Sequence, residues 1–262
     1  RKANHFLFWK TKKSNQYPVK IFLRLSLRPS PNILILLKTN HDIKFVNDSP
    51  DNNEVVSSYK AYKARVGKEK IPCYEPSVGK EELELVIDVI NKNWLSEGEY
   101  TRKFESQLAE ICHRKHAVCF SSATSALISG MKSLGIKEGD EVVVPSFSHS
   151  ADPNSIAVTG ATPVFADVDE RTLCLSVKTI DAVRTPKTKA VLFVSAYGNV
   201  ADLNEMENYT KKNNLFFIND CAPALFGTFK GKPIAAYGDF SALSFFADKI
   251  ITTGEGGMLL SD

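Results

Sequence analysis

Lys249 is the residue of this chain whose chemistry depends most on its sequence context. It follows the segment Ser244-Phe245-Phe246-Ala247-Asp248 and precedes a stretch that ends in Gly254-Glu255-Gly256-Gly257. Desolvation beside an apolar strand favours the neutral amine of a lysine, which can form a Schiff base and move a proton between substrate and cofactor. An ordinary solvated lysine is the alternative interpretation, and only the flanking residues argue against it.

The carboxyl of Asp220 is a second chemical group, because it ends the strand-like run Leu215-Phe216-Phe217-Ile218-Asn219. Parallel sheets bind ligands at the carboxyl ends of their strands, so an acid at this point can meet a bound molecule. In an enzyme that uses pyridoxal phosphate (PLP), such a carboxylate keeps the ring nitrogen protonated, and the ring then acts as an electron sink. A cap for the next helix or a surface ion pair is the alternative interpretation.

A third segment, Ser121-Ser122-Ala123-Thr124-Ser125-Ala126-Leu127, follows a strand-like run and opens a helix. Free backbone N–H groups and the positive end of the helix dipole favour an anion there, and the hydroxyl groups add donors. The segment therefore predicts a phosphate site. Because Ser and Thr are also good helix caps, simple capping remains the alternative.

The chain from residue 71 onward predicts a scaffold that can bring these three segments together. Short strand-like runs alternate with helical stretches, which is typical of an α/β fold with a mostly parallel sheet flanked by helices. Such a sheet places ligands at one edge. The predicted strands are 117–120, 142–144, 163–165, 190–194, 215–218 and 242–246.

The predicted helices follow from apolar stripes with a spacing of three and four residues. One stripe is Leu83, Val86, Ile87 and Ile90, and a second is Tyr100, Phe104, Leu108 and Ile111. Further helices are predicted after the segment 121–127 and at 151–159, 176–184 and 202–213.

Composition excludes several classes of protein. No apolar run reaches the ~18 to 20 residues that a membrane-spanning helix needs, so we expect no membrane partner. The five cysteines have neither the spacing of a metal site nor the density of a disulfide framework, and they favour a reducing cytoplasm. We therefore expect no metal site. The cysteines are Cys73, Cys112, Cys119, Cys174 and Cys221.

Residues 1–70 differ in charge from the rest of the chain, because they carry 15 Lys and Arg against 5 Asp and Glu. The segment is punctuated by Pro18, Pro29, Pro31 and Pro50, and it has no basic helix face or nucleic-acid motif. It also lacks the pattern of a secretory signal. We predict a basic extension over residues 1–70 that is solvated or disordered, without an assigned function or a nucleic-acid partner, followed by a ligand-binding domain over residues 71–262.

The order of motifs from about residue 71 to 262 resembles the DegT/StrS family of PLP-dependent sugar aminotransferases. The motifs that correspond to the family's cofactor site are Ser122-Ala123-Thr124-Ser125-Ala126-Leu127, Asp220, and Lys249 with its flanking residues. The remaining motifs are Trp94-Leu95-Ser96-Glu97-Gly98 with Phe104-Glu105, Gly139-Asp140-Glu141-Val142-Val143-Val144-Pro145-Ser146-Phe147, Gly160-Ala161-Thr162-Pro163-Val164-Phe165 with Asp167, and Tyr197-Gly198 with Ala201-Asp202.

The resemblance implies a fold and a set of roles. The fold is the large domain of a PLP-dependent transferase (aspartate aminotransferase fold type I), truncated after the cofactor lysine so that the smaller C-terminal domain is missing. Lys249 binds the cofactor covalently and Asp220 pairs with its ring nitrogen. The other implied cofactor residues are Ala123, Thr124 and Ser244 at the phosphate and His149 stacked on the ring.

Three residues depart from the pattern that the family implies. Ala123 stands where glycine is usual, so that its Cβ is expected to crowd the phosphate or to require an unfavourable backbone angle. Pro223 replaces a Gln or His that binds the ring hydroxyl of the cofactor, and Ser195 replaces a frequent histidine. These departures motivate a degenerate, non-catalytic relative with a binding or regulatory role as an alternative.

The function that the resemblance implies is transamination of a keto-sugar, with a nucleotide-linked sugar as substrate and an amino acid such as glutamate as donor. It would serve the synthesis of cell-surface polysaccharides or of secondary-metabolite sugars, as a cytoplasmic homodimer. A PLP-dependent sugar dehydratase is a further alternative, although such relatives tend to carry histidine where this chain has Lys249.

Overall fold

The computed structural model describes residues 7–9, 21–23, 74 and 76–262, which divide into two units, Arg1–Leu95 and Ser96–Asp262. The predicted extension 1–70 lies outside the described residues, apart from the antiparallel strands β1 (Leu7–Trp9) and β2 (Ile21–Leu23). The first unit also contains helix α3 (Lys80–Asn91), which begins with a hydrogen bond of 2.7 Å from the backbone N–H of Gly79 to Oε2 of Glu82. The stripe predicted around Leu83 is therefore helical.

The second unit is built on one seven-stranded sheet with the strand order β3-β11-β10-β7-β6-β4-β5. Strand β10 is parallel to β7, and the pairs β7–β6, β6–β4 and β4–β5 are parallel as well. The prediction of a mostly parallel sheet is confirmed. The strands are β3 (His116–Phe120), β4 (Glu141–Pro145), β5 (Thr162–Ala166), β6 (Thr188–Val194), β7 (Phe216–Asp220), β10 (Phe240–Ser244) and β11 (Gly257–Ser261).

Strand β11 runs against all the other strands of this sheet, because it pairs antiparallel with both β10 and β3. Its first residue, Gly257, lies across from Ser244, the last residue of β10, and from Phe120, the last residue of β3. The start of β11 therefore lies at the edge where the parallel strands end. That edge is the one predicted to bind a ligand.

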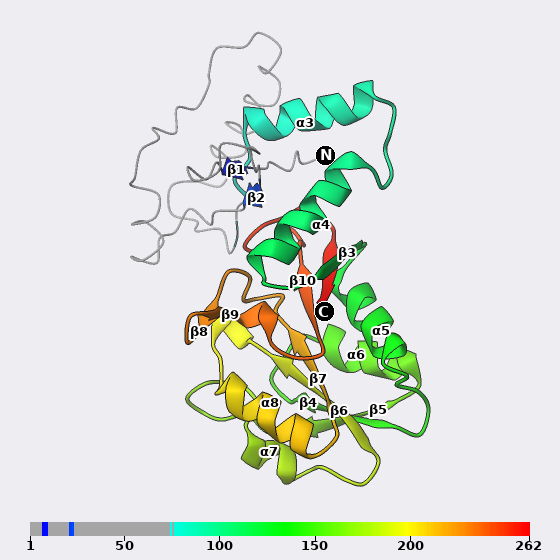
Figure 1. Cartoon of the computed structure of the whole chain (residues 1–262), viewed down its shortest axis with the longest axis vertical. Coiled ribbons are helices and arrows are strands. Elements are labelled where there is room, and N and C mark those ends of the chain that lie inside the picture. The colour runs from blue at the N-terminus through cyan, green and yellow to red at the C-terminus, as the bar shows by residue number, and fades with distance from the viewer. Residues whose placement is uncertain (1–6, 10–20, 24–73, 75) are drawn as a thin grey trace, which may run out of the picture. The chain divides into compact units, whose positions relative to one another are not determined.

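Helices cover the sheet on both faces, with α5 and α6 on one side and α7 and α8 on the other (Figure 1). The core under α5 and α6 includes Ile156 of α6, Val194 of β6 and Ile218 of β7, all at most 5% exposed. Hydrophobic burial in this layer fixes which strand residues face α5 and α6. The helices of the second unit are α4 (Glu99–Ile111), α5 (Ala123–Ser133), α6 (Ala151–Thr159), α7 (Val177–Asp181) and α8 (Leu203–Lys212).

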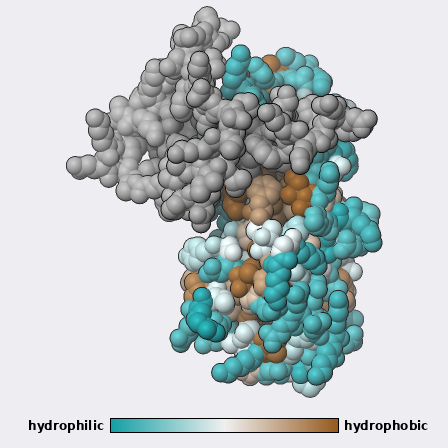
Figure 2. Space-filling model, turned by 60° about the vertical axis from the view of Figure 1, so that its left-hand side comes forward, coloured by the Kyte–Doolittle hydropathy of each residue, from teal (hydrophilic) through white to brown (hydrophobic). Residues whose placement is uncertain are grey.

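Short elements lie in the connections between the larger ones. Strands β8 (Thr228–Phe229) and β9 (Lys232–Pro233) form a small hairpin, and two 3₁₀ turns, η2 (Ala196–Gly198) and η3 (Ile234–Ala236), follow β6 and β9. The visible face of the second unit in Figure 2 is mostly hydrophilic, with smaller hydrophobic patches between.

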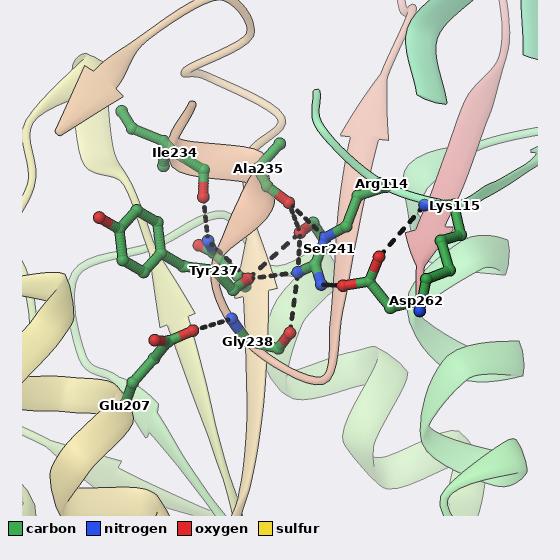
Figure 3. A network of polar contacts seen from close by, with 10 residues as sticks. Arg114, Lys115, Glu207, Ile234, Ala235, Tyr237, Gly238, Ser241 and Asp262 are labelled. Atoms are coloured by element: carbon green, nitrogen blue, oxygen red, sulfur yellow. Dashed lines mark hydrogen bonds and ion pairs between the residues drawn. The ribbon is translucent and has the colours of Figure 1, made fainter. Parts of the chain in front are cut away.

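The buried guanidinium of Arg114 joins the start of β3 to the segment that leads into β10 (Figure 3). It donates hydrogen bonds to the carbonyl oxygens of Ala235, Tyr237 and Gly238, at 2.7 to 2.9 Å. It also forms an ion pair of 2.9 Å with Asp262. A buried cation requires such partners, because an unpaired charge in the interior is costly.

The positions of the predicted elements agree closely with the structure. Helix α6 has the predicted bounds, and the other predicted helices and strands of the second unit are present with shifted ends. The largest shift is in the predicted helix 176–184, which ends three residues earlier as Val177–Asp181, and the predicted strand 242–246 lies two residues earlier at Phe240–Ser244. The apolar run that follows the lysine segment forms β11.

Candidate functional site

Lys249 lies in a loop between β10 and β11 that is held by backbone hydrogen bonds. The N–H of Lys249 donates to the carbonyl of Phe246 at 3.0 Å, and the N–H of Phe245 donates to the carbonyl of Gly256 at 2.9 Å. The hydroxyl of Thr252 donates to the carbonyl of Phe245 at 2.9 Å. These contacts position the lysine backbone at the ligand edge of the sheet.

The ammonium group of Lys249 is partly exposed and lies 3.4 Å from Oδ1 of Asp248. Its side chain is 26% exposed, so it is accessible to a ligand while its stem is largely covered. The positive charge also acts on Asp220, where it opposes a rise in the pKa of that carboxyl. The structure thus brings the two residues that the sequence singled out first to the same edge.

Asp220 is the last residue of β7 and is 6% exposed. Burial raises the pKa of its carboxyl, and a hydrogen bond of 2.8 Å from the N–H of Ala222 to Oδ1 opposes that rise. The positive charges of Lys249 and His149 also oppose the rise in the pKa of Asp220. A nearly buried acid with cationic neighbours fits the binding of a protonated ring nitrogen.

The N-terminus of α5 lies beside the start of β11. The hydroxyl of Ser122 caps the helix by accepting a hydrogen bond of 3.1 Å from the N–H of Ser125. The N–H groups of Ala123 and Thr124 belong to the first turn, so they have no partner within the helix. An anion fits at this point. The cap does not compete with an anion for these two N–H groups, because it uses the N–H of Ser125.

Ser244 ends β10 and pairs with Gly257, the first residue of β11, which lies against the first turn of α5. Ser244 is 8% exposed, and its hydroxyl accepts a hydrogen bond of 3.4 Å from the N–H of Phe246. Gly257 lies across from it, and a Cβ at Gly257 would overlap the backbone of Ser122 and Ala123. Glycine at this position allows β11 to approach the first turn of α5.

His149 is exposed and follows β4 by a short loop. Its Nδ1 accepts a hydrogen bond of 3.1 Å from the N–H of Ala151, the first residue of α6. This contact holds the imidazole against its own helix. The charge of His149 lowers the pKa of Asp220, so the ring lies near the same carboxyl as Lys249.

The three departures from the family pattern differ in their structural effect. Ala123 lies within helix α5 and is absent from the residues with positive φ, so the expected backbone strain does not arise among the described residues. Ser195 is fully buried, its N–H donates to the carbonyl of Asp220 at 3.2 Å, and its hydroxyl has no partner in the described part of the chain. Pro223 supplies no side-chain donor.

Asp152, in the first turn of α6, is a residue of this site that the sequence analysis missed. Its carboxyl is fully buried, and the charge of Asp220 and burial itself raise its pKa, with burial the larger cause. No sequence pattern marks it, because the buried face of α6 consists mostly of polar residues, namely Asp152, Ser155 and Thr159 beside Ile156.

The described residues contain neither a metal-binding cluster nor a membrane-spanning helix. Within 7–9, 21–23, 74 and 76–262, no group of three His, Cys, Asp or Glu side chains is arranged to hold a metal ion. No helix among these residues has the length and apolar character needed to cross a bilayer.

The chain is similar to known proteins over residues 76–262, which match the family described as the DegT/DnrJ/EryC1/StrS aminotransferase family. It is 44% identical over 193 residues to the GDP-perosamine synthase of Escherichia coli O157:H7, covering 73% of this chain and 53% of that protein. It is 41% identical over 192 residues to the spore coat polysaccharide biosynthesis protein SpsC of Bacillus subtilis (strain 168), covering 73% of this chain and 49% of that protein.

Among solved structures, GDP-4-keto-6-deoxy-D-mannose-3-dehydratase of E. coli with bound hydrated PLP has a TM-score of 0.70. It is 26% identical and covers 74% of this chain and 51% of the dehydratase. The chain spans about half the length of the curated relatives it matches. Because the family matches more than half of the chain and the motifs lie at one edge of a sheet of the same fold, the chain belongs to the DegT/DnrJ/EryC1/StrS aminotransferase family.

Proposed function

We propose that this protein takes part in PLP-dependent amination of a keto group on a nucleotide-linked sugar, with an amino acid such as glutamate as the amino donor. The observation that carries the proposal is the common location of Lys249 and Asp220 at the carboxyl edge of the sheet, where the lysine charge acts on the buried carboxyl. The product would enter the synthesis of cell-surface polysaccharides or of secondary-metabolite sugars.

The side chains present fit the chemical groups of PLP. The amine of Lys249 would bind the cofactor covalently, and the carboxylate of Asp220 would pair with the ring nitrogen. The free N–H groups of Ala123 and Thr124, with the hydroxyl of Ser244, would hold the phosphate. When bound, PLP supplies an electron sink for the carbon from which a proton is removed.

Two residues of the chain would then act on the substrate and the ring. The amine of Lys249 would take a proton from one carbon and return it to another, as a general acid and base. The imidazole of His149 would stack on the ring, in an orientation set by the hydrogen bond between its Nδ1 and the N–H of Ala151. Its ring is accessible to such a ligand because the residue is exposed.

We also propose that the protein works as a homodimer in the cytoplasm. The side chains of Cys112, Cys174 and Cys221 are buried and unpaired, and a reducing compartment keeps thiols in that form. No nucleic-acid or membrane partner is part of this proposal.

A dehydratase acting on a similar sugar is the second candidate, because the dehydratase with bound PLP shares the fold of this chain. The amine of Lys249 favours amino transfer over this alternative. The two activities separate in one assay, since amino transfer consumes the amino donor in proportion to product and the dehydration does not yield an amino-sugar.

The test is covalent capture of the cofactor on the purified chain. Borohydride reduction after incubation with PLP should fix the cofactor on the peptide that contains Lys249, as identified by mass spectrometry. The variant Lys249→Ala should lose this adduct, whereas Lys212→Ala, which removes an exposed lysine at the end of α8, should keep it. An adduct that persists in Lys249→Ala, or that maps to another lysine, would contradict the proposal.

A further inference from the structure

Asp152 occupies a position on helix α6 where an apolar residue is expected. The buried residues of this helix are Asp152, Ser155, Ile156 and Thr159, which is the spacing of one helix face. Asp152 is 0% exposed although its side chain is an acid. A carboxyl is seldom buried unless it is paired, so its neighbours define its role.

The fold directs the carboxyl of Asp152 toward that of Asp220. Ile156, one helical turn after Asp152, packs in the same core as Ile218 of β7. Asp220 follows Ile218 by two residues in the strand, so both face the same side of the sheet. Because α6 connects two parallel strands, its first turn lies at their carboxyl edge. The two acids therefore meet at the end of their elements.

Neither carboxyl oxygen of Asp152 receives a hydrogen bond from a donor in the described part of the chain. The nearby hydroxyl of Ser148 donates instead to carbonyl oxygens, at 3.3 Å for His149 and 3.5 Å for Pro145. Two carboxylates are both acceptors, so a hydrogen bond between them requires a proton on one. A buried pair of like charges is also strongly disfavoured.

The surroundings decide which acid keeps the proton. Asp220 accepts the hydrogen bond from the N–H of Ala222 and faces the charges of Lys249 and His149, all of which favour its ionised form. Asp152 faces the charge of Lys249 and the hydroxyl of Ser148, while burial and the charge of Asp220 raise its pKa well above the ordinary value. Lys249 in turn lies 3.4 Å from Oδ1 of Asp248. The hydrogen bonds therefore favour the proton on Asp152, whose carboxyl receives no donor in the described part of the chain, over Asp220, which receives one.

We propose that Asp152 is a positioning residue whose un-ionised carboxyl donates a hydrogen bond to the carboxylate of Asp220. This inference rests on the proposed function, in which Asp220 binds the ring nitrogen of PLP. The donated hydrogen bond stabilises the ionised form of Asp220 and fixes its orientation, and it leaves other lone pairs of that carboxylate for the ring nitrogen. Asp152 itself does not contact the reacting atoms.

The first test needs no cofactor, so it is independent of the proposed function. Infrared spectroscopy of the cofactor-free chain at neutral pH should show the carbonyl band of a protonated carboxylic acid. Every protein compared carries Glu82→Gln, because burial raises the pKa of Glu82 to about 7 and its carboxyl would add a band of its own. The band should be absent in Asp152→Asn and present in Ser155→Ala, which removes a hydrogen bond of 2.7 Å to the backbone carbonyl of Asp152 but changes neither carboxyl. A wild-type spectrum without this band, or a band that survives in Asp152→Asn, overturns the proposal.

The second test uses the chain loaded with PLP that carries ¹⁵N in its ring. Asp152→Asn keeps a neutral donor, so the nitrogen shift should remain that of a protonated ring and PLP should bind within about threefold of wild type. Asp152→Leu removes the donor, so the shift should move toward the unprotonated value and binding should weaken on the order of tenfold. Equal effects of Asn and Leu, or no effect of Leu, overturn the positioning role.

The two tests separate the possible failures. If wild-type chain does not bind PLP covalently at Lys249, the proposed function fails, while the infrared result still decides where the proton lies. If Asp152→Leu does not fold, the comparison of wild type, Asp152→Asn and Ser155→Ala by infrared spectroscopy retains its full force. Recovery of the wild-type nitrogen shift by Asn but not by Leu is a result that a purely structural role would not produce.

Discussion

Gly257 and Ser244 lie directly across from each other in the β10–β11 ladder, and the space beside Gly257 is filled by backbone of another segment. That backbone belongs to Ser122 and Ala123, at the first turn of α5. The proposed phosphate site therefore depends on a residue with no side chain. Glycine is needed here for the close approach and not for backbone freedom, because the φ of Gly257 is not in the left-handed region.

Replacing Gly257 with alanine should disturb both the stability of the chain and its affinity for PLP. The new Cβ must displace the backbone of Ser122 and Ala123, and such overpacking costs about 1 to 3 kcal/mol of unfolding free energy. Urea denaturation and equilibrium titration with PLP measure the two effects. Ser261→Ala, at the other end of β11, is the control and should change neither quantity by a comparable amount. Unaltered stability in Gly257→Ala would refute the close approach.

Removing the guanidinium of Arg114 should destabilise the second unit without a direct effect on the ligand site. Arg114→Met leaves the carbonyl groups of Ala235, Tyr237 and Gly238 without this donor and leaves Asp262 without its partner. Leaving a buried carbonyl acceptor unsatisfied costs about 1 to 3 kcal/mol, and the loss of the ion pair to Asp262, which is 49% exposed, adds less. Chemical denaturation provides the measurement. Lys115→Met, which removes the neighbouring exposed cation, should have an effect several-fold smaller, and equal effects would contradict the assignment.

Asp202 should contribute to stability as the N-cap of α8. Its Oδ1 accepts hydrogen bonds from the N–H groups of Asn204 and Glu205 at 3.0 and 3.1 Å, and Oδ2 lies 3.0 Å from the ammonium of Lys230. Asp202→Ala should lower the unfolding free energy by about 1 kcal/mol, whereas Asp202→Asn retains the cap and should lose less. Thermal and urea unfolding distinguish the two variants. The hydrogen bonds lower the pKa of Asp202, so this contribution should vanish as pH falls below the ordinary range for Asp.

The pair Asp152 and Asp220 should give the opposite pH dependence. Burial raises the pKa of both carboxyls, so the folded chain binds more protons than the unfolded chain. Their contribution to stability is present below the unfolded pKa and is lost as pH rises through the folded values. Wild type should therefore lose stability relative to Asp152→Asn as pH rises above about 4. Urea midpoints of the two proteins across a pH series supply the comparison, and parallel curves would contradict the raised pKa.

Much of the fold was predictable because local pattern and tertiary structure agree. Helix α6 was predicted with its observed bounds, and Asp220 and Ser244 both lie at the ends of strands that the apolar runs identified. Alternating strands and helices leave few topologies for a parallel sheet. The locations of the site residues could be predicted for the same reason. Their roles rest on the family resemblance and remain proposals.

The direction of β11 and the role of Asp152 could not be read from the sequence. A short apolar run such as 258–260 indicates a buried strand but contains no information about its partners or its orientation. Asp152 lies in a segment with no recognised motif, and a carboxyl in the first turn of a helix ordinarily interacts with the helix dipole. Only the burial of the side chain and the proximity of Asp220 reveal the acid pair.

Strand β11 also has a consequence for how the protein is made. Along the chain β3 is the first strand of the large sheet and β11 is the last, yet in the described structure β3 pairs with β11 alone. While the ribosome is still synthesising the intervening segments, β3 has no partner strand, and an unpaired strand edge invites association with other chains. The pairing of β3 is therefore delayed until β11 has been synthesised. Until then, residues 116–120 are the part of the sheet most prone to associate with other chains.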